Sequence, residues 1–181
     1  MSRQSLVEHI PGLRRYARAL TSDPWAADDL VQDTLERACS RWRLWLAGSD
    51  LRAWLFTVMH NLFISEVRQL RRRADWGNSV DLDAVAHELH APAAEPGNLI
   101  DLQRCLMQLP PNQRAVLLLI TLEELSYDEV AKVTGVPVGT VMSRLSRARE
   151  RMRALMDTPA VTPDTQSAPV SHQAPLLRVL K

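Results

Sequence analysis

Arginines recur at short intervals near the end of the chain, at Arg144, Arg147, Arg149, Arg151 and Arg153. A guanidinium group makes planar, bidentate hydrogen bonds with phosphate and with guanine, so this spacing favours contact with nucleic acid. The preceding residues read as a short helix and a tight turn. A helix that follows such a turn and carries a cationic face fits the major groove of DNA.

Local signals set the limits of this predicted helix-turn-helix. Ser126 and Glu129 have the spacing of a capping box, and Gly135 stands where a helix end needs a left-handed residue. The second helix is expected to bury one stripe, formed by Val141, Leu145, Ala148 and Met152. Side chains near its start are placed to reach base edges, namely Ser143, Arg144, Ser146 and Arg147. Arg149, Arg151 and Arg153 lie further along and are expected to contact phosphates.

An acidic stripe is the second feature that could bind a partner. Its members follow helical spacing: Asp28, Asp29, Gln32, Asp33 and Glu36. Carboxylates on one helix face can dock on basic residues of a partner and fix its register. A solvated face that also stabilises the start of its helix is the other interpretation.

A third set of polar side chains lies along the segment 51–73. It comprises Asn61, Ser65, Arg68, Arg71, Arg72 and Arg73. Cations suit a nucleic-acid backbone, while polar groups can receive unstacked bases. Trp54 in the same segment is interpreted mainly as a core residue, and His60 as a surface or hydrogen-bonded histidine.

The elements that must position these residues are all helical. Helices are expected over 5–20, 25–46, 51–73, 111–124 and 138–156, with further ones from 99 and from 127, and no segment has a strand pattern. Trp42 and Trp45 are expected on the apolar face of the second helix; Leu51, Leu55, Val58 and Leu62 form that of the third. Asp50 is the predicted cap of the third helix. The fold class is therefore all-α.

Composition divides the chain further. Residues 74–97 contain prolines and acids but no Lys or Arg, which predicts a flexible acidic linker between 5–73 and 98–157. The proline-rich residues 158–181 are expected to be a disordered tail. The net charge of +1 conceals separate basic and acidic clusters.

The sequence also argues against several classes of protein. No apolar run is long enough for a membrane helix and no secretion signal is present, so we expect a cytoplasmic protein without membrane insertion. Cys39 and Cys105 lack the spacing of a metal site and are expected to be buried free thiols. Neither a metal site, a cofactor site nor a catalytic residue is predicted, so the chain is not expected to be an enzyme.

Five blocks in order carry a resemblance to a known family: 27–35 (ADDLVQDTL), 51–61 (LRAWLFTVMHN), 68–73 (RQLRRR), 109–114 (LPPNQR) and 137–150 (PVGTVMSRLSRARE). In order and approximate spacing they resemble bacterial extracytoplasmic-function (ECF, group 4) sigma factors of the sigma-70 family. The resemblance covers about residues 5–156. It implies a sigma2-like domain over 5–73 and a sigma4-like helix-turn-helix domain over 98–157.

The resemblance also implies roles for the polar sets. The acidic stripe would bind the clamp helices of core RNA polymerase. The polar set from Asn61 to Arg73 would recognise and melt the −10 promoter element, and the start of the last helix would read the −35 element. Met142 stands where many relatives have Lys or Arg, so the −35 sequence preference does not transfer. The linker would be either a solvated tether or a nucleic-acid mimic threading a polymerase channel.

The family implies a stress- or signal-responsive factor held by an anti-sigma factor. A rival interpretation is a ligand-responsive helix-turn-helix regulator that binds its operator without polymerase, with 1–73 as a sensor. No dimerisation heptad or effector pocket is evident for it. Specific promoter binding that requires core polymerase would separate the two.

Overall fold

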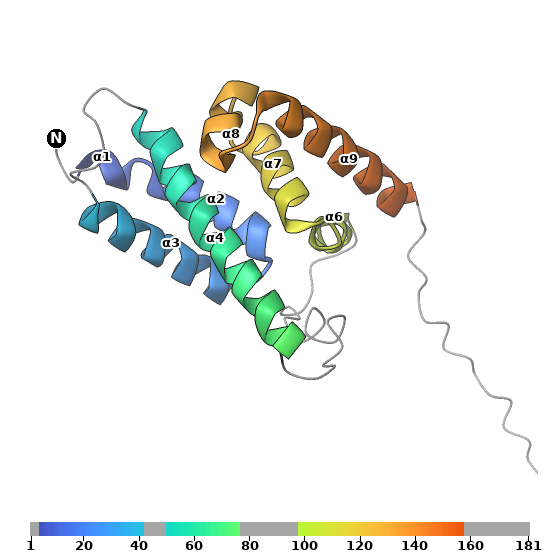
Figure 1. The fold of residues 1–181 in the computed structure, drawn as a ribbon, viewed down its shortest axis with the longest axis horizontal. Helices are drawn as coiled ribbons and strands as arrows, with labels where there is room; N and C mark the ends of the chain where they lie inside the picture. The colour runs from blue at the N-terminus through green and yellow to red at the C-terminus, as the bar shows by residue number, and fades with distance from the viewer. Residues whose placement is uncertain (1–3, 42–49, 77–97, 158–181) are drawn as a thin grey trace, which may run out of the picture.

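The computed structural model of the chain describes residues 4–41, 50–76 and 98–157, and every regular element in these ranges is an α-helix. The predicted tail, Trp42 and Trp45 lie outside the described residues, and so does the predicted linker except for residues 74–76. Figure 1 shows the helices as two groups lying side by side. We call residues 4–76 the N-terminal half and residues 98–157 the C-terminal half. None of the described helices is long and apolar enough to cross a membrane.

The N-terminal half contains α1 (Gln4–Val7), α2 (Ile10–Thr21), α3 (Pro24–Ser40) and α4 (Leu51–Trp76). Pro11 lies in the first turn of α2, where its missing N–H costs nothing. Asp23 caps α3 by accepting a hydrogen bond of 3.0 Å from the Trp25 amide. Asp50 caps α4, as predicted, by accepting from the amides of Arg52 and Ala53 at 2.9 and 3.3 Å.

Helices α2, α3 and α4 pack around one apolar core. The rings of Tyr16 and Phe56 meet edge to face with their centroids 5.4 Å apart. The predicted stripe of α4 was partly wrong: Leu51 and Leu55 are buried, but Phe56, Met59 and Phe63 complete the buried face, whereas Val58 and Leu62 are only half-buried. The reason is that α4 faces both α3 and the C-terminal half, so its buried face is wider than one stripe.

The C-terminal half contains α6 (Asn98–Met107), α7 (Pro111–Thr121), α8 (Tyr127–Thr134) and α9 (Val138–Asp157). Pro111 begins α7, as expected from its position. Helix α9 lies across α6, α7 and α8 (Figure 1). The core of this half includes the buried side chains of Val116, Leu119, Val130 and Val133.

Three further expectations need correction. The described part of the second helix ends at Ser40, and α7 ends at Thr121 instead of residue 124, where a loop takes over. Cys105 is buried, but Cys39 is exposed on α3. Cys39 lies three residues after Glu36, so the helical period places it on the exposed acidic face and not on the buried one.

Candidate nucleic-acid and partner interfaces

The helix-turn-helix forms as the local sequence predicts. Ser126 and Glu129 make the full capping box, and the Ser126 amide donates to Glu129 Oε2 at 2.7 Å. Gly135 ends α8 with a φ of 67°, a conformation that costs glycine little. The carbonyl of Pro137 then accepts from the amides of Thr140 and Val141 at 2.8 and 3.1 Å, which starts α9.

The predicted apolar stripe of α9 is buried, and this determines which residues of the helix face solvent. Val141, Leu145, Ala148 and Met152 are all in the core. Ser146, Arg147 and Arg149 are exposed, Met142 is about half exposed, and Ser143 and Arg144 are partly buried. The Ser143 hydroxyl donates to the Thr140 carbonyl at 3.0 Å, so its proton is used within the helix.

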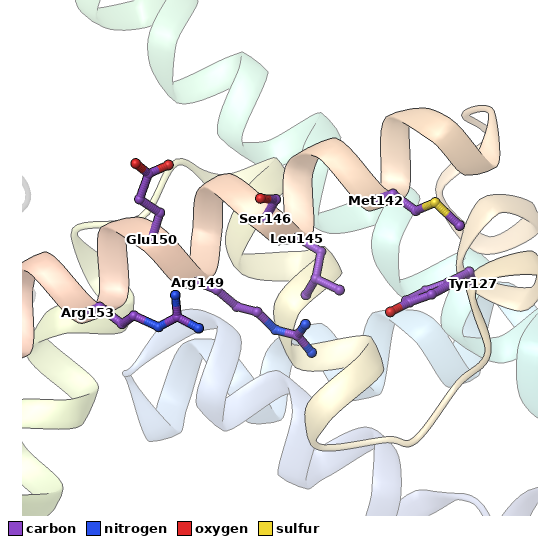
Figure 2. A pocket seen from close by; sticks show the side chains of 7 residues that line it. All are labelled: Tyr127, Met142, Leu145, Ser146, Arg149, Glu150 and Arg153. Carbon is purple, nitrogen blue, oxygen red and sulfur yellow. The ribbon is translucent and has the colours of Figure 1, made fainter.

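The residues predicted to contact duplex DNA divide between two faces of α9. Met142, Ser146 and Arg149 line an outward groove of about 450 Å³ together with Tyr127, Glu150 and Arg153. Figure 2 shows Arg149 and Arg153 extending along this groove from successive turns of α9. Arg144 instead lines a different cavity, on the side of α4. The outward face is thus open to a ligand while Arg144 faces the other half.

The acidic stripe of α3 is exposed along its whole length. Asp28 Oδ1 pairs with Arg14 Nε at 3.2 Å, and the Gln32 amide donates to Glu36 Oε1 at 3.0 Å. Asp29 and Asp33 make no ion pair within the described residues. The opposite face, with Ala27, Leu30, Val31, Thr34 and Ala38, is buried. Burial therefore fixes α3 so that its carboxylates point to solvent.

The polar set of α4 lies on exposed helix. Asn61, Ser65 and Arg68 follow one another at helical spacing, and Arg71, Arg72 and Arg73 are exposed one turn later. Helix α4 continues to Trp76, so these arginines belong to the helix itself. Arg68, Arg71 and Arg72 have the i, i+3 and i+4 spacing of one helix face, whereas Arg73 points to another side of the helix, so the arginines form a cationic helix end that could contact a nucleic-acid backbone.

His60 differs from its sequence interpretation. Its side chain is only 4% exposed, and its Nδ1 atom has no hydrogen-bond partner among the described residues. Burial, reinforced by the positive charges of Arg144 and Arg68, lowers the pKa of His60 to about 4. His60 is therefore neutral at physiological pH.

One cavity brings together residues from two predicted sites. A space of about 290 Å³ between α4 and the helix-turn-helix is lined by His60, Asn61, Ile64, Ser65, Arg68, Asn112, Thr134, Val136 and Arg144. Asn61, Ser65 and Arg68 belong to the polar set predicted to contact the −10 element, and Arg144 belongs to the residues predicted to read the −35 element. The other residues predicted for the two promoter elements lie outside this cavity: Arg71, Arg72 and Arg73 are exposed on α4, and Met142, Ser146 and Arg149 line the outward groove of α9.

Sequence reasoning missed the charged residues between the halves. Arg114 is buried, donates to the Met107 carbonyl at 3.3 Å, and lies 5.8 Å from the centre of the Phe63 ring. Burial lowers the pKa of Arg114 to about 10, so it stays charged at neutral pH. Glu123 is buried as well, against Arg15 and Arg52 of the N-terminal half. The partners are about 50 to over 100 residues apart in sequence, so no local pattern indicates them.

Histidine, cysteine and carboxylate side chains do not gather into a group that could hold a metal ion anywhere in the described ranges.

Comparison with known proteins identifies the family. Residues 6–60 match the family model described as the Sigma2 domain of PhyR, and residues 99–152 match Sigma-70, region 4. The chain is 36% identical to the ECF RNA polymerase sigma factor EcfG of Rhodopseudomonas palustris, over 85% of this chain and 84% of that protein. It is 34% identical to the ECF RNA polymerase sigma factor SigC of Mycobacterium tuberculosis, over 75% and 73%.

A solved structure agrees with these relatives. The sigma factor RpoE of Bartonella quintana, determined in complex with the anti-sigma factor NepR, is 34% identical and superposes with a TM-score of 0.73, covering 87% of this chain and 97% of that chain. Both helix groups and their order along the sequence thus have a counterpart in a sigma factor. The chain belongs to the extracytoplasmic-function RNA polymerase sigma factors of the sigma-70 family.

Proposed function

We propose that this sigma factor binds core RNA polymerase through the acidic stripe of α3 and places two DNA-binding surfaces on a promoter. One surface is the polar set of α4, from Asn61 to Arg73, for the melted −10 element. The other is the start and outward face of α9 for the duplex −35 element. The sigma factor acts in the cytoplasm and itself binds no cofactor.

The observation that carries the proposal is the separation of charge on exposed helix faces. Asp28, Asp29, Gln32, Asp33 and Glu36 point to solvent from a helix whose other face is buried. The arginines of α9 project from a helix anchored in the same way. A carboxylate face repels DNA and attracts a basic protein surface, whereas the arginine face does the opposite. One chain can therefore bridge a protein partner and DNA.

Within α9 the proposal assigns two tasks. Arg144, near the helix start, and Arg147 are suited to base edges, because the first turns of a recognition helix enter the groove. Arg149 lies in the outward groove with Met142 and Ser146 and is suited to phosphate. Met142 offers apolar contact, for example to a thymine methyl group, in place of a cation.

We also propose that an anti-sigma factor controls this chain and that a stress or another signal releases it. The support is the complex of the Bartonella quintana relative with NepR. Co-purification from cells that yields polymerase but no other specific partner would contradict this part.

A binding experiment separates the proposal from a regulator that acts without polymerase. Electrophoretic mobility shifts would compare promoter fragments with random fragments, using the chain alone and the chain with core polymerase. We expect sequence-specific complexes only with core polymerase. Tight, specific binding by the chain alone would favour the ligand-responsive regulator.

A further inference from the structure

The two halves pack against each other where α4 contacts α7 and α8 and where α2 contacts α6 and α7. We call this contact surface the junction. Figure 1 shows the C-terminal group lying along one side of α2 and α4. The cavity of about 290 Å³ belongs to the junction, because α4 lines it together with α7, α8 and α9. Only two of its nine lining residues, Ile64 and Val136, are aliphatic, so apolar packing does not explain it.

Two arginines in the cavity have no counter-charge. Arg68 reaches it from α4 and Arg144 from α9. The ion pairs of the described residues involve Arg14, Arg15 and Arg52 instead, and none of the described carboxylates lines the cavity. A cleft lined by one sign of charge focuses its field and concentrates ions of the opposite sign. The cavity is therefore complementary to an anion.

A buried imidazole in the same cavity also lacks a partner. His60 is only 4% exposed, and no described residue makes a hydrogen bond with its Nδ1 atom. The charges of Arg144 and Arg68 help burial to lower the pKa of His60, so both guanidinium groups lie near the ring. A neutral imidazole still carries one N–H, which can donate to an oxyanion. Since buried polar atoms are normally hydrogen-bonded, the unpaired Nδ1 points to a group from outside the chain that binds there.

Uncharged donors complete the lining of the cavity. Asn61 and Ser65 lie one helical turn apart on α4. Asn112 lies in the first turn of α7, where the positive end of the helix dipole favours a negative charge. The Thr134 hydroxyl is already used, because it donates to the Val130 carbonyl at 2.7 Å. Amide and hydroxyl donors thus surround the two arginines.

The donor set and the size of the cavity select the class of anion. Guanidinium groups make bidentate, charge-assisted hydrogen bonds with phosphate, and several donors converging from different elements suit its tetrahedral oxygens. The volume lies at the lower end of the range for small-molecule sites, about 300–1,000 Å³. None of the described Phe, Tyr or Trp residues lines the cavity to stack a base. These features favour a small phosphorylated molecule over a nucleic-acid strand.

We propose that this cavity binds a phosphate group, either as inorganic phosphate or as part of a small phosphate monoester. The groups that hold it are Arg68, Arg144, Asn61, Ser65, Asn112 and His60. The inference goes beyond the proposed function, because it needs neither polymerase nor promoter, although four of these side chains are also proposed promoter contacts. Its failure would leave the proposed function untouched.

Phosphate binding is tested on the full chain by nuclear magnetic resonance. The buffer contains no phosphate or sulfate, and chloride keeps the ionic strength constant while inorganic phosphate is added. The signals to follow are the side-chain N–H groups of Asn61, Asn112, Arg68 and Arg144. We expect them to shift together with one saturable dissociation constant, and the absence of saturable shifts would overturn the inference.

Two pairs of variants locate the site. Arg68→Gln and Arg144→Gln each remove a charge from the cavity and should weaken phosphate binding about tenfold or more. Arg71→Gln and Arg147→Gln are the matched controls, because they remove the same charge from exposed positions of α4 and α9 outside the cavity. The controls should change the phosphate affinity by less than about twofold. Equal losses in both pairs would show that phosphate follows only the overall positive charge, and would overturn the inference.

Asn112→Leu tests the site without changing any charge. Asn112 is exposed, and its loss should weaken phosphate binding about threefold, as expected for one uncharged hydrogen bond. This variant decides the question if an arginine variant fails to fold, since an unchanged phosphate affinity would then overturn the inference.

A comparison of ligands identifies the source of the phosphate group. Inorganic phosphate and ribose 5-phosphate are compared with a single-stranded oligonucleotide that has no terminal phosphate, at equal concentrations of phosphorus. We expect the two small ligands to shift the Asn112 and Arg144 signals more than the oligonucleotide does. Shifts with the oligonucleotide alone would assign the cavity to a nucleic-acid backbone and overturn the inference.

Discussion

The outer faces and the junction of this sigma factor use charge in opposite ways. On the outside, the acids of α3 and the arginines of α9 from Arg147 onward are exposed, on helices whose opposite faces are buried. At the junction, Glu123, His60 and Arg114 are buried, and their environment determines their charge and partners. Exposed charges contribute little to stability and much to recognition, whereas buried charges select one arrangement of the halves.

The largest effect should come from reversing the acidic stripe. Asp29→Lys/Asp33→Lys places like charges against a basic partner, which costs several kcal/mol. We expect core polymerase affinity to fall about a thousandfold, on the order of 4 kcal/mol. The free energy of unfolding should change by less than about 0.5 kcal/mol, because both sites are exposed.

Fluorescence titration with core polymerase and urea unfolding measure the two quantities separately. Glu8→Lys, an exposed acid outside the stripe, is the control and should leave the affinity unchanged. Equal losses of core polymerase affinity in the stripe variant and in the control would show that the net charge of the chain determines the affinity, and not the position of the acidic stripe.

The second effect concerns His60 and pH. Its pKa falls from an ordinary 6.5 to about 4 in the folded chain, so the unfolded chain binds the extra proton between these values. The contribution of neutral His60 is fully present above pH 6.5 and is lost as the pH falls towards 4, amounting to about 3 kcal/mol.

Urea unfolding at pH 7, 6, 5 and 4 checks this, with His60→Gln as comparison. The variant should lose much of the slope between pH 6.5 and 4. An unchanged slope would mean that other groups dominate the acid sensitivity and that the junction does not hold His60 neutral.

A third effect distinguishes positions on α9. Arg149→Ala should weaken −35 duplex binding by the polymerase complex about tenfold, similarly for all sequences, and lower the salt slope by about 1. Arg144→Ala should instead relax the preference for particular bases. Arg37→Ala, an exposed arginine of α3, is the control. Sequence-dependent losses for Arg149→Ala would reassign it to base contact.

The smallest effect is the loss of a helix cap. Asp50→Ala removes the acceptor for the Arg52 and Ala53 amides and should cost about 1 kcal/mol of unfolding free energy. Glu66→Ala, exposed in the middle of α4, should have almost no effect. A loss well below 0.5 kcal/mol for Asp50→Ala would mean that water replaces the cap.

Local sequence patterns predicted the helix caps and the exposed outer faces well. The Asp50 cap, the capping box at Ser126 and the left-handed Gly135 involve residues within three positions of one another, and the buried stripe of α9 follows from helical period alone. Exposure of the α3 acids followed in the same way, because acidic and apolar residues occupy opposite faces of one helical period.

The junction could not be predicted by such reasoning. Glu123 lies 108 and 71 residues from its partners Arg15 and Arg52, and nothing near it in the sequence distinguishes it from its exposed neighbour Glu124. His60 and Phe63 are buried because α4 meets a second group of helices, which period within α4 does not indicate. The roles of Asn61, Ser65 and Arg68 in promoter melting stay proposals, which substitution of each residue would test.

The central claim is that this chain directs core RNA polymerase to promoters. Transcription by sigma-free core polymerase on fragmented genomic DNA, with and without the chain, followed by mapping of start sites, tests it most directly. We predict transcripts from a discrete set of start sites sharing −35 and −10 elements, only when both components are present. Failure to initiate at any discrete site, with the chain folded and bound to core polymerase, would contradict the account.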